Sequence, residues 1–174
     1  DCIAGKISTY GSTSCTNCSA GYYANEVIKA TSCTACEAGK YGDQDLQVDS
    51  SACKDCAAGK YSSAKGVASS DGCNDCSPGK YSTTNSGNDD EDKCIHCAAN
   101  TYNADQGRNE SCYSCEEGTT SSVGSTVCTS CDAGQYLTLD DSSTNKVCKD
   151  CIAGKISTYG STSCTNCSAG YYAN

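Results

Sequence analysis

The sequence contains no methionine, tryptophan or phenylalanine, and it has one proline and one histidine in 174 residues. Leucine occurs only at positions 46, 137 and 139, and all 12 aromatic residues are tyrosine. These absences exclude an ordinary globular core, because such a core buries large apolar side chains that this chain lacks. The remaining positions are rich in Ser, Thr, Gly, Asn and Asp, which favour turns and loops.

Features that would indicate an enzyme or a nucleic-acid partner are also missing. The single histidine, His96, has no recognisable nucleophile or metal partner in the sequence, so we expect it in a surface turn. The net charge of −9 and the pI near 4.4 argue against nucleic acid, which is bound by clustered Lys and Arg. We therefore predict a protein that is not an enzyme, needs no cofactor and binds no nucleic acid.

Long apolar segments are absent as well. No apolar run approaches the ~18 residues that a membrane-spanning helix needs, and no window shows the apolar period of an amphipathic helix. The sequence begins without a methionine or a signal peptide, so we expect it to be an internal part of a longer mature chain. We predict no membrane span in this segment.

Cysteine is abundant instead, at 19 of the 174 residues. A cysteine share above ~8–10 per cent is typical of disulfide scaffolds, which form in oxidising compartments. We therefore predict a secreted protein, located outside the cell or on the cell surface, whose fold depends on disulfides.

The sequence is an array of repeats on two scales. Residues 1–25 recur without a change at 150–174, which gives a long period of 149 residues. We predict one long period at 1–149, made of eight Cys-rich units of 16–21 residues, and the start of the next identical period at 150–174. The CxxC pairs that define the units begin at Cys15, Cys33, Cys53, Cys73, Cys94, Cys112, Cys128, Cys148 and Cys164.

The second cysteine of most pairs begins the same motif, C-x-x-G-x-Y. Its glycine is replaced once, by Asn100, and Asn is the non-glycine residue that best tolerates positive φ, so we predict a left-handed turn there. We predict that the tyrosine is the packing residue of each unit, with Ile7, Ile156 and Thr120 in its place in the units with the shortest loops. The tyrosines are Tyr23, Tyr41, Tyr61, Tyr81, Tyr102 and Tyr136.

Short alternating stretches such as GKYS and GKIST predict strands of a few residues joined by turns. The predicted fold class is therefore small disulfide-rich repeats, with short β-strands and loops stacked into an elongated solenoid-like rod and no substantial helix.

The simplest disulfide pattern joins the second cysteine of each CxxC pair to the first cysteine of the next pair. An interlocked pattern, first to first and second to second, is the main alternative, because sequence does not determine connectivity. In the adjacent pattern Cys167 is left over, and we expect its partner just after residue 174. The adjacent pairs are Cys2–Cys15, Cys18–Cys33, Cys36–Cys53, Cys56–Cys73, Cys76–Cys94, Cys97–Cys112, Cys115–Cys128, Cys131–Cys148 and Cys151–Cys164.

Zinc binding is the other structural role open to repeated CxxC pairs, since two pairs with a spacer of roughly 15–20 residues are typical of zinc ribbons. Here the pairs follow one another without alternating sites and linkers, and the chain is acidic and rich in Ser and Thr. We therefore expect disulfides and no metal. A thioredoxin-like redox site would need a βαβ pattern, which the sequence lacks.

The C-x-x-G-x-Y motif, followed by 8–12 residues and C-x-x-C, resembles the Cys-rich modules of tumour-necrosis-factor receptors and the ephrin-receptor-like repeats of extracellular proteins. The resemblance covers the whole chain, unit by unit. In the receptor modules the cysteine before G-x-Y bonds to the next cysteine along, which implies the adjacent pairing here. The unchanged 25-residue recurrence is also similar to arrays in protist surface antigens and in the shaft proteins of flagellar hairs (mastigonemes).

Two kinds of surface site are predicted by short motifs. N-x-S/T sequons at Asn109, Asn17 and Asn166 predict N-glycosylation, with Asn109 the better candidate because the middle residue of the Asn17 sequon is a predicted disulfide cysteine. The Ser/Thr-rich segment 82–87 is a candidate for O-glycans. The acidic run 88–93 lacks the ligand spacing and glycine of an EF-hand loop, so we expect a solvated loop there and not a calcium site.

These patterns together predict a structural protein, the tandem-repeat shaft of an extracellular fibre or filament stabilised by a ladder of disulfides between successive CxxC units. Its predicted partner is itself, because identical patches at a fixed interval allow one contact to propagate into a homo-oligomeric filament. The alternative is a cell-surface antigen or a receptor-like stalk that presents a binding domain.

Overall fold

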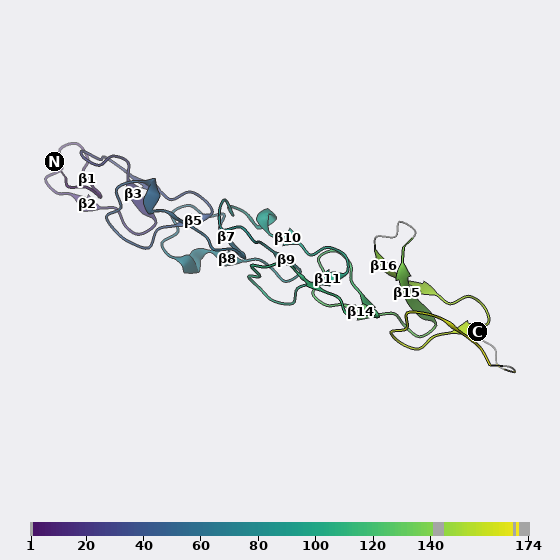
Figure 1. Cartoon of the computed structure of the whole chain (residues 1–174). Helices are drawn as coiled ribbons and strands as arrows, with labels where there is room; N and C mark the ends of the chain where they lie inside the picture. The colour runs from purple at the N-terminus through teal and green to yellow at the C-terminus, as the bar shows by residue number, and fades with distance from the viewer. Residues whose placement is uncertain (1, 141–144, 169, 171–174) are drawn as a thin grey trace. The chain divides into compact units, whose positions relative to one another are not determined.

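The computed structural model describes residues 2–140, 145–168 and 170. In these residues the secondary structure consists of short strands and single-turn 3₁₀ helices, without an α-helix (Figure 1). This confirms the predicted fold class of small disulfide-rich repeats without substantial helix. Stacking into a solenoid-like rod stays a prediction.

Each described strand pairs with a neighbour in sequence to form a two-stranded sheet. Most strands have two or three residues, and only β15 and β16 reach five. The pairs are β1 (Lys6–Ile7) with β2 (Thr16–Asn17), β3 (Tyr22–Ala24) with β4 (Cys33–Ala35), β5 (Lys40–Tyr41) with β6 (Lys54–Asp55), β7 (Lys60–Tyr61) with β8 (Asn74–Asp75), β9 (Lys80–Tyr81) with β10 (Ile95–His96), β11 (Thr101–Tyr102) with β12 (Tyr113–Ser114), β13 (Thr119–Thr120) with β14 (Thr129–Ser130), β15 (Gln135–Leu139) with β16 (Lys146–Asp150), and β17 (Lys155–Ile156) with β18 (Thr165–Asn166).

Each hairpin is closed by a disulfide, and we number the closed hairpins loops 1 to 9 in chain order. The bonds follow the adjacent pattern and not the interlocked one, and their sequence separations are 13 to 18 residues. The loops are Cys2–Cys15, Cys18–Cys33, Cys36–Cys53, Cys56–Cys73, Cys76–Cys94, Cys97–Cys112, Cys115–Cys128, Cys131–Cys148 and Cys151–Cys164.

The contacts between Cα atoms divide the chain into two compact units. The boundary lies within loops 5 and 6, so loops 1 to 4 belong to the first unit and loops 7 to 9 to the second. The predicted division of the chain at residue 149 stays a prediction. The first unit is Asp1–Ser77, Tyr81–Ile95 and Gln106–Glu110, and the second is Pro78–Lys80, His96–Asp105 and Ser111–Asn174.

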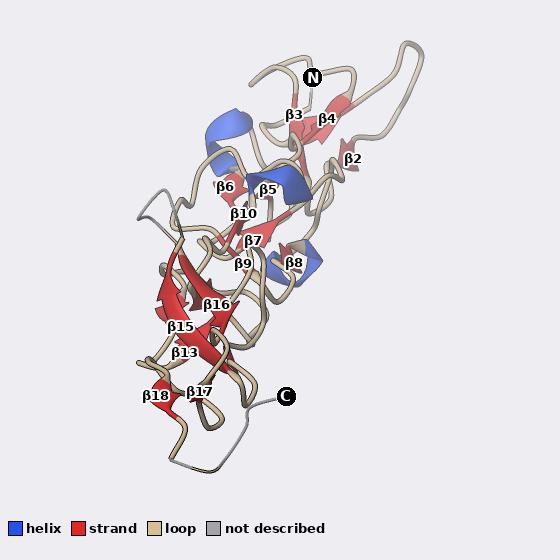
Figure 2. Cartoon of the chain, turned by 90° about the vertical axis from the view of Figure 1, so that its right-hand side faces the viewer, coloured by secondary structure: helices blue, strands red, loops and turns tan. Residues whose placement is uncertain are grey.

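Three 3₁₀ helices precede the closing cysteines of loops 3, 4 and 5, and Figure 2 shows them in blue. In η1 and η3 an aspartate caps the first turn, because its side chain accepts a hydrogen bond from an amide that the helix leaves unpaired. The 3₁₀ turns lie in three of the four longest loops, where they use the extra residues before the disulfide. The helices are η1 (Ser50–Ala52), η2 (Ser70–Gly72) and η3 (Glu91–Lys93).

The buried interior of the loops consists mainly of cystines and of the residue directly after the motif tyrosine. Ser62 is 1% exposed and Asn103 is 0% exposed, whereas Tyr61 and Tyr102 are only half-buried. The expectation that the tyrosine is the packing residue is corrected accordingly, since the buried position is the next one along the chain. Polar residues fit this position because the Asn103 amide group donates to the carbonyl of Lys80 at 2.8 Å.

The glycine of C-x-x-G, which we call the turn residue, has positive φ in the described loops. Asn100, the single replacement, also has positive φ at +64°, which confirms the predicted left-handed turn. This conformation allows the turn carbonyl to accept a hydrogen bond from the amide of the cysteine that opens the next loop. The bond from Cys56 to Gly39 is 2.8 Å long, and its counterparts recur along the chain.

A set of three backbone hydrogen bonds, which we call the inter-loop ladder, joins loops 2 and 3, 3 and 4, 5 and 6, 6 and 7, and 8 and 9. Among the described residues the ladder is incomplete between loops 1 and 2 and between loops 4 and 5, and none of its bonds joins loops 7 and 8. In the first bond, the amide of the turn residue donates to the carbonyl of the residue that follows the tyrosine in the next loop. In the second bond, the amide of the residue that follows the tyrosine in the same loop donates to a carbonyl further along the next loop. The third bond returns from the next loop to the opening cysteine. Between loops 3 and 4 the donors and acceptors are Gly39 to Ser62 (2.7 Å), Gly42 to Val67 (2.9 Å) and Gly66 to Cys36 (2.8 Å).

The same ladder is present in both compact units. Because each bond uses backbone atoms, it can form again in loops whose side chains differ. Between loops 2 and 3 it joins Gly21 to Gly42, Ala24 to Gln47 and Leu46 to Cys18; between loops 6 and 7, Asn100 to Ser121, Asn103 to Ser125 and Gly124 to Cys97; and between loops 8 and 9, Gly134 to Ser157, Leu137 to Ser161 and Gly160 to Cys131.

Where the third ladder bond is present, its donor is a second left-handed residue of the loop, which the sequence did not reveal. Gly66 and Gly124 have φ of +71° and +75°, but Leu46 takes the same role with φ of +62°. A leucine gives no sequence signal for positive φ, and bulky residues rarely adopt it. The ladder bond from Leu46 to the Cys18 carbonyl, at 2.8 Å, supplies a local compensation for this conformation.

Turn glycines also lie against the loop two further along the chain. A Cβ on Gly59 of loop 4 would clash with the carbonyl group of Gly107 in loop 6, and one on Gly21 would clash with the carbonyl of Gly66. Glycine is therefore needed at these positions both for its φ and for the space. A Cβ on Gly134, in contrast, meets no described atom within 4 Å.

The close approach predicts a difference between two glycine-to-alanine substitutions in the 174-residue chain. Gly134→Ala should lose about 1–2 kcal/mol of unfolding free energy from the left-handed φ alone. Gly59→Ala should lose about 1–3 kcal/mol more, because the added methyl overpacks the loop 6 backbone. Urea unfolding with intact disulfides measures both, and equal losses would contradict the contact between loops 4 and 6.

Candidate functional site

The structural element that recurs along this chain is the disulfide-closed hairpin, and the duplicated sequence forms it in the same way twice. Lys6 is opposite Asn17 in β1 and β2, and Lys155 is opposite Asn166 in β17 and β18. These two hairpins lie in different compact units and have different neighbours. The hairpin is therefore set by its local sequence and its disulfide.

Ion pairs lie across several hairpins at the surface. Lys40 pairs with Asp55 at 2.8 Å and Lys60 with Asp75 at 2.6 Å, each joining the lysine of G-K-Y to the aspartate inside the following CxxC. The side chains of both pairs are roughly one third to two fifths exposed to solvent. Each pair therefore contributes only a modest cross-strand stabilisation. They align charges along the hairpins but do not form a catalytic arrangement.

Two aspartates of loop 3 have perturbed acidity. A hydrogen bond from the Lys54 ammonium lowers the pKa of Asp43, and the same bond raises the pKa of Lys54. Hydrogen bonds from Ser51 lower the pKa of Asp49, which caps η1. All of these groups are at the surface, so their shifts mark structural pairs and caps and not a proton-transfer site.

The acidic run 88–93 is used in local structure. Asp90 accepts a hydrogen bond from the amide of Asp92 at 3.1 Å as the cap of η3, and Lys93 lies 3.8 Å from Asp89. Glu91 accepts a hydrogen bond from the Ser77 hydroxyl. In the described part of the chain, no three His, Cys, Asp or Glu side chains are grouped as metal ligands.

His96 lies in strand β10, so its expected place in a turn is corrected. Its side chain is exposed, and its Nδ1 would be 2.8 Å from a Cβ built on Gly124. His96 therefore packs beside the second left-handed residue of loop 7. No nucleophile is placed beside it by the contacts that the described residues show.

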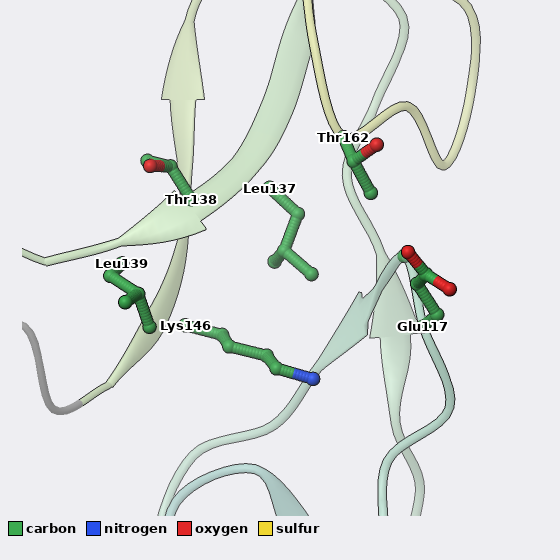
Figure 3. Close-up of a pocket in the computed structure, with 7 residues that line it drawn as sticks. Glu117, Leu137, Thr138, Leu139, Lys146 and Thr162 are labelled. Carbon is green, nitrogen blue, oxygen red and sulfur yellow. The ribbon is translucent and has the colours of Figure 1, made fainter.

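A pocket of about 420 Å³ lies in the second compact unit (Figure 3). Leu137 forms part of its wall from β15, while Lys146 of β16 and Glu117 of loop 7 carry the charges nearby. Leu139 is half exposed at its edge. No sequence motif predicts this pocket, and its only sequence signal is the apolar segment QYLTL, which forms the five-residue strand β15.

The three sequons differ in their surroundings. Asn109 is exposed and lies outside the described strands. Asn17 and Asn166 are exposed as well, but they lie in β2 and β18 and directly precede Cys18 and Cys167. Cys18 is fully buried in its disulfide, so the middle of that sequon is fixed in the hairpin.

Cys167 forms no disulfide within the described residues and is half-buried. It occupies the position of Cys18 in the repeated sequence, and Cys18 is bonded to Cys33. Its expected partner after residue 174 stays a prediction.

No protein-family model matches this chain, and no curated protein matches it either. The described residues contain no helix that is both long and apolar enough to cross a membrane. The function must therefore be argued from the repeats, the disulfides and the ladder.

The disulfide pattern predicts the products of proteolysis without reduction. Peptides linked through Cys36–Cys53 and Cys56–Cys73 should be recovered, because each bond closes a single hairpin. Mass spectrometry of the unreduced digest identifies the linked peptides, with the reduced digest as control. Peptides linked through Cys36 and Cys56 would contradict this pattern and indicate interlocked loops.

The sequon environments predict which asparagine carries a glycan. We expect a glycan on Asn109 in protein from its natural source, and none on Asn17, because an early disulfide at Cys18 restricts access to that sequon. Enzymatic deglycosylation in ¹⁸O water followed by mass spectrometry labels each occupied asparagine. Label on Asn17 alone would contradict the expectation.

Proposed function

We propose that this protein is a structural protein, the tandem-repeat shaft of an extracellular fibre or filament. The observation that carries the proposal is the inter-loop ladder, which in the described residues joins five of the eight successive loop pairs through the same backbone atoms in loops of different sequence. Repeats that contact their neighbours in one constant way can be added without limit. The unchanged recurrence of residues 1–25 at 150–174 supports an array built by such addition.

The disulfides support a location outside the cell. Nine bonds in one chain of this length require an oxidising compartment, and they compensate for the missing apolar core. On this proposal the protein is a secreted glycoprotein without enzymatic activity. It is related in organisation to the ephrin-receptor-like repeats and flagellar-hair shaft proteins that its sequence resembles.

Exposed apolar side chains at equivalent positions support self-association. Ile3 and Ile152 are equally exposed, and Tyr10 and Tyr159 are both at the surface. The repeat places the same pair of side chains at an interval of 149 residues. Identical patches at a constant interval suit lateral contact between copies, which continues along a filament and does not close.

The proposal predicts what electron microscopy of native, unreduced material should show. Long uniform filaments are expected, and reduction should remove them, because the hairpins lack a core that could hold them without disulfides. The matched control is the same material alkylated without reduction. Short separate rods attached to membrane would overturn the proposal and favour a stalk that presents a binding domain.

A further inference from the structure

The duplicated sequence has two different environments, and the first copy shows what covers it. Gly5 of loop 1 is buried, and a Cβ there would clash with the carbonyl of Leu46 in loop 3. The amide of Ser8 donates to the Ala30 carbonyl of loop 2 at 3.1 Å. Ile7 packs against a buried cluster that includes Ala30. Loops 2 and 3 therefore cover one face of loop 1.

In the second copy, no described residue covers the same face. Gly154, Ile156 and Ser157 of loop 9 correspond to Gly5, Ile7 and Ser8, and we call them the open face. Gly154 is exposed with φ of +82°, and a Cβ there meets no described atom within 4 Å. Ile156 is 50% exposed. The amide of Ser157 has no backbone acceptor among the residues that the structure describes.

The opposite face of the same sequence is covered in loop 9, whereas in loop 1 no described residue covers it. Gly160 donates to the Cys131 carbonyl of loop 8 at 2.9 Å, while its counterpart Gly11 has no such partner among the described residues. Tyr159 is 69% exposed, whereas its counterpart Tyr10 is fully exposed. Each copy thus shows the contacts that the other lacks, and the two sets of contacts use opposite faces.

We propose that the open face of loop 9 is a docking surface for loops with the sequence of loops 2 and 3, supplied by a following long period of the same chain. The occupant is defined by the repeat itself, because Cys164-Thr-Asn-Cys167 leads out of loop 9 as Cys15-Thr-Asn-Cys18 leads from loop 1 into loop 2. A segment with the sequence of residues 26–48, which spans parts of loops 2 and 3, carries both Ala30 and Leu46, which contact loop 1. The junction between successive long periods then repeats the contacts that join loop 1 to loops 2 and 3.

This inference rests on the proposed tandem-repeat function, and it adds the partner that covers the open face of loop 9. It is tested with a chain in which residues 26–55 are appended after Asn174, the counterpart of Asn25. The appended segment brings Cys33, Cys36 and Cys53, so that every cysteine has a partner in the adjacent pattern. Mass spectrometry first checks that the added disulfides have formed.

Two readouts compare the extended chain with the 174-residue chain. Hydrogen exchange at the Ser157 amide should slow at least 10-fold on extension. Gly154→Ala should lower the unfolding temperature several times more in the extended chain, where the methyl meets the Leu46 counterpart, than in the shorter chain. As a first control, Gly5→Ala should lower the unfolding temperature of both chains about as much as Gly154→Ala lowers that of the extended chain. As a second control, Gly87→Ala, whose Cβ has no described neighbour, should lower the unfolding temperature of both chains equally.

A second variant keeps the test valid if Gly154→Ala prevents folding. Ile156→Ser should leave the 174-residue chain nearly unchanged and destabilise the extended chain. Equal effects in both chains, with unchanged exchange at Ser157, would overturn the docking surface. Protection of Ser157 in the shorter chain, together with dimers in sedimentation, would assign the face to a second molecule and also overturn the proposal. Filaments seen in native material would leave the proposed function intact in either case.

Discussion

The hydrogen bond between a left-handed turn carbonyl and the amide of the next opening cysteine is the constraint on which this structure depends. It sets the hairpin so that the disulfide can close it, and it leaves the turn amide pointing to the next loop, as with Gly39 and Ser62. The cystines and the ladder then replace the apolar core that the composition excludes. A change at the turn residue therefore affects its own hairpin, the next loop through the ladder, and, where the backbone approaches closely, the loop beyond.

The sequence was informative where the physical requirement falls on one residue type. The turn glycines and Asn100 indicate positive φ directly, and the spacing of the CxxC pairs favours disulfides that close short loops. The sequence was uninformative where the requirement is met by backbone atoms, as at Leu46, whose left-handed conformation depends on its bond to Cys18. It also did not show that the residue after the tyrosine is buried, because Ser62, Asn103 and Leu137 share that position and no common polarity.

The sequence indicated which kinds of surface site to expect, but it did not indicate the structural surroundings of each site. Short motifs located the sequons and the acidic run, but only the structure shows that Asp90 caps η3 and that His96 lies in a strand beside Gly124. The pocket beside Leu137 depends on the longer β15 and β16 and on side chains from two other loops, which no local pattern brings together. Contacts between loops n and n+2 are similarly absent from any single repeat and appear only when several are folded.

The arrangement of the disulfides has a mechanical consequence. Each bond joins residues that are 13 to 18 positions apart, and only two residues separate one closed loop from the next. A pulling force on the two ends would pass through the sulfur bridges and the short CxxC links, and it would bypass the residues inside every loop. In the oxidised chain the disulfides thus shield the hairpin residues from load, and reduction of each bond would add the residues of its loop to the length of chain that carries the force.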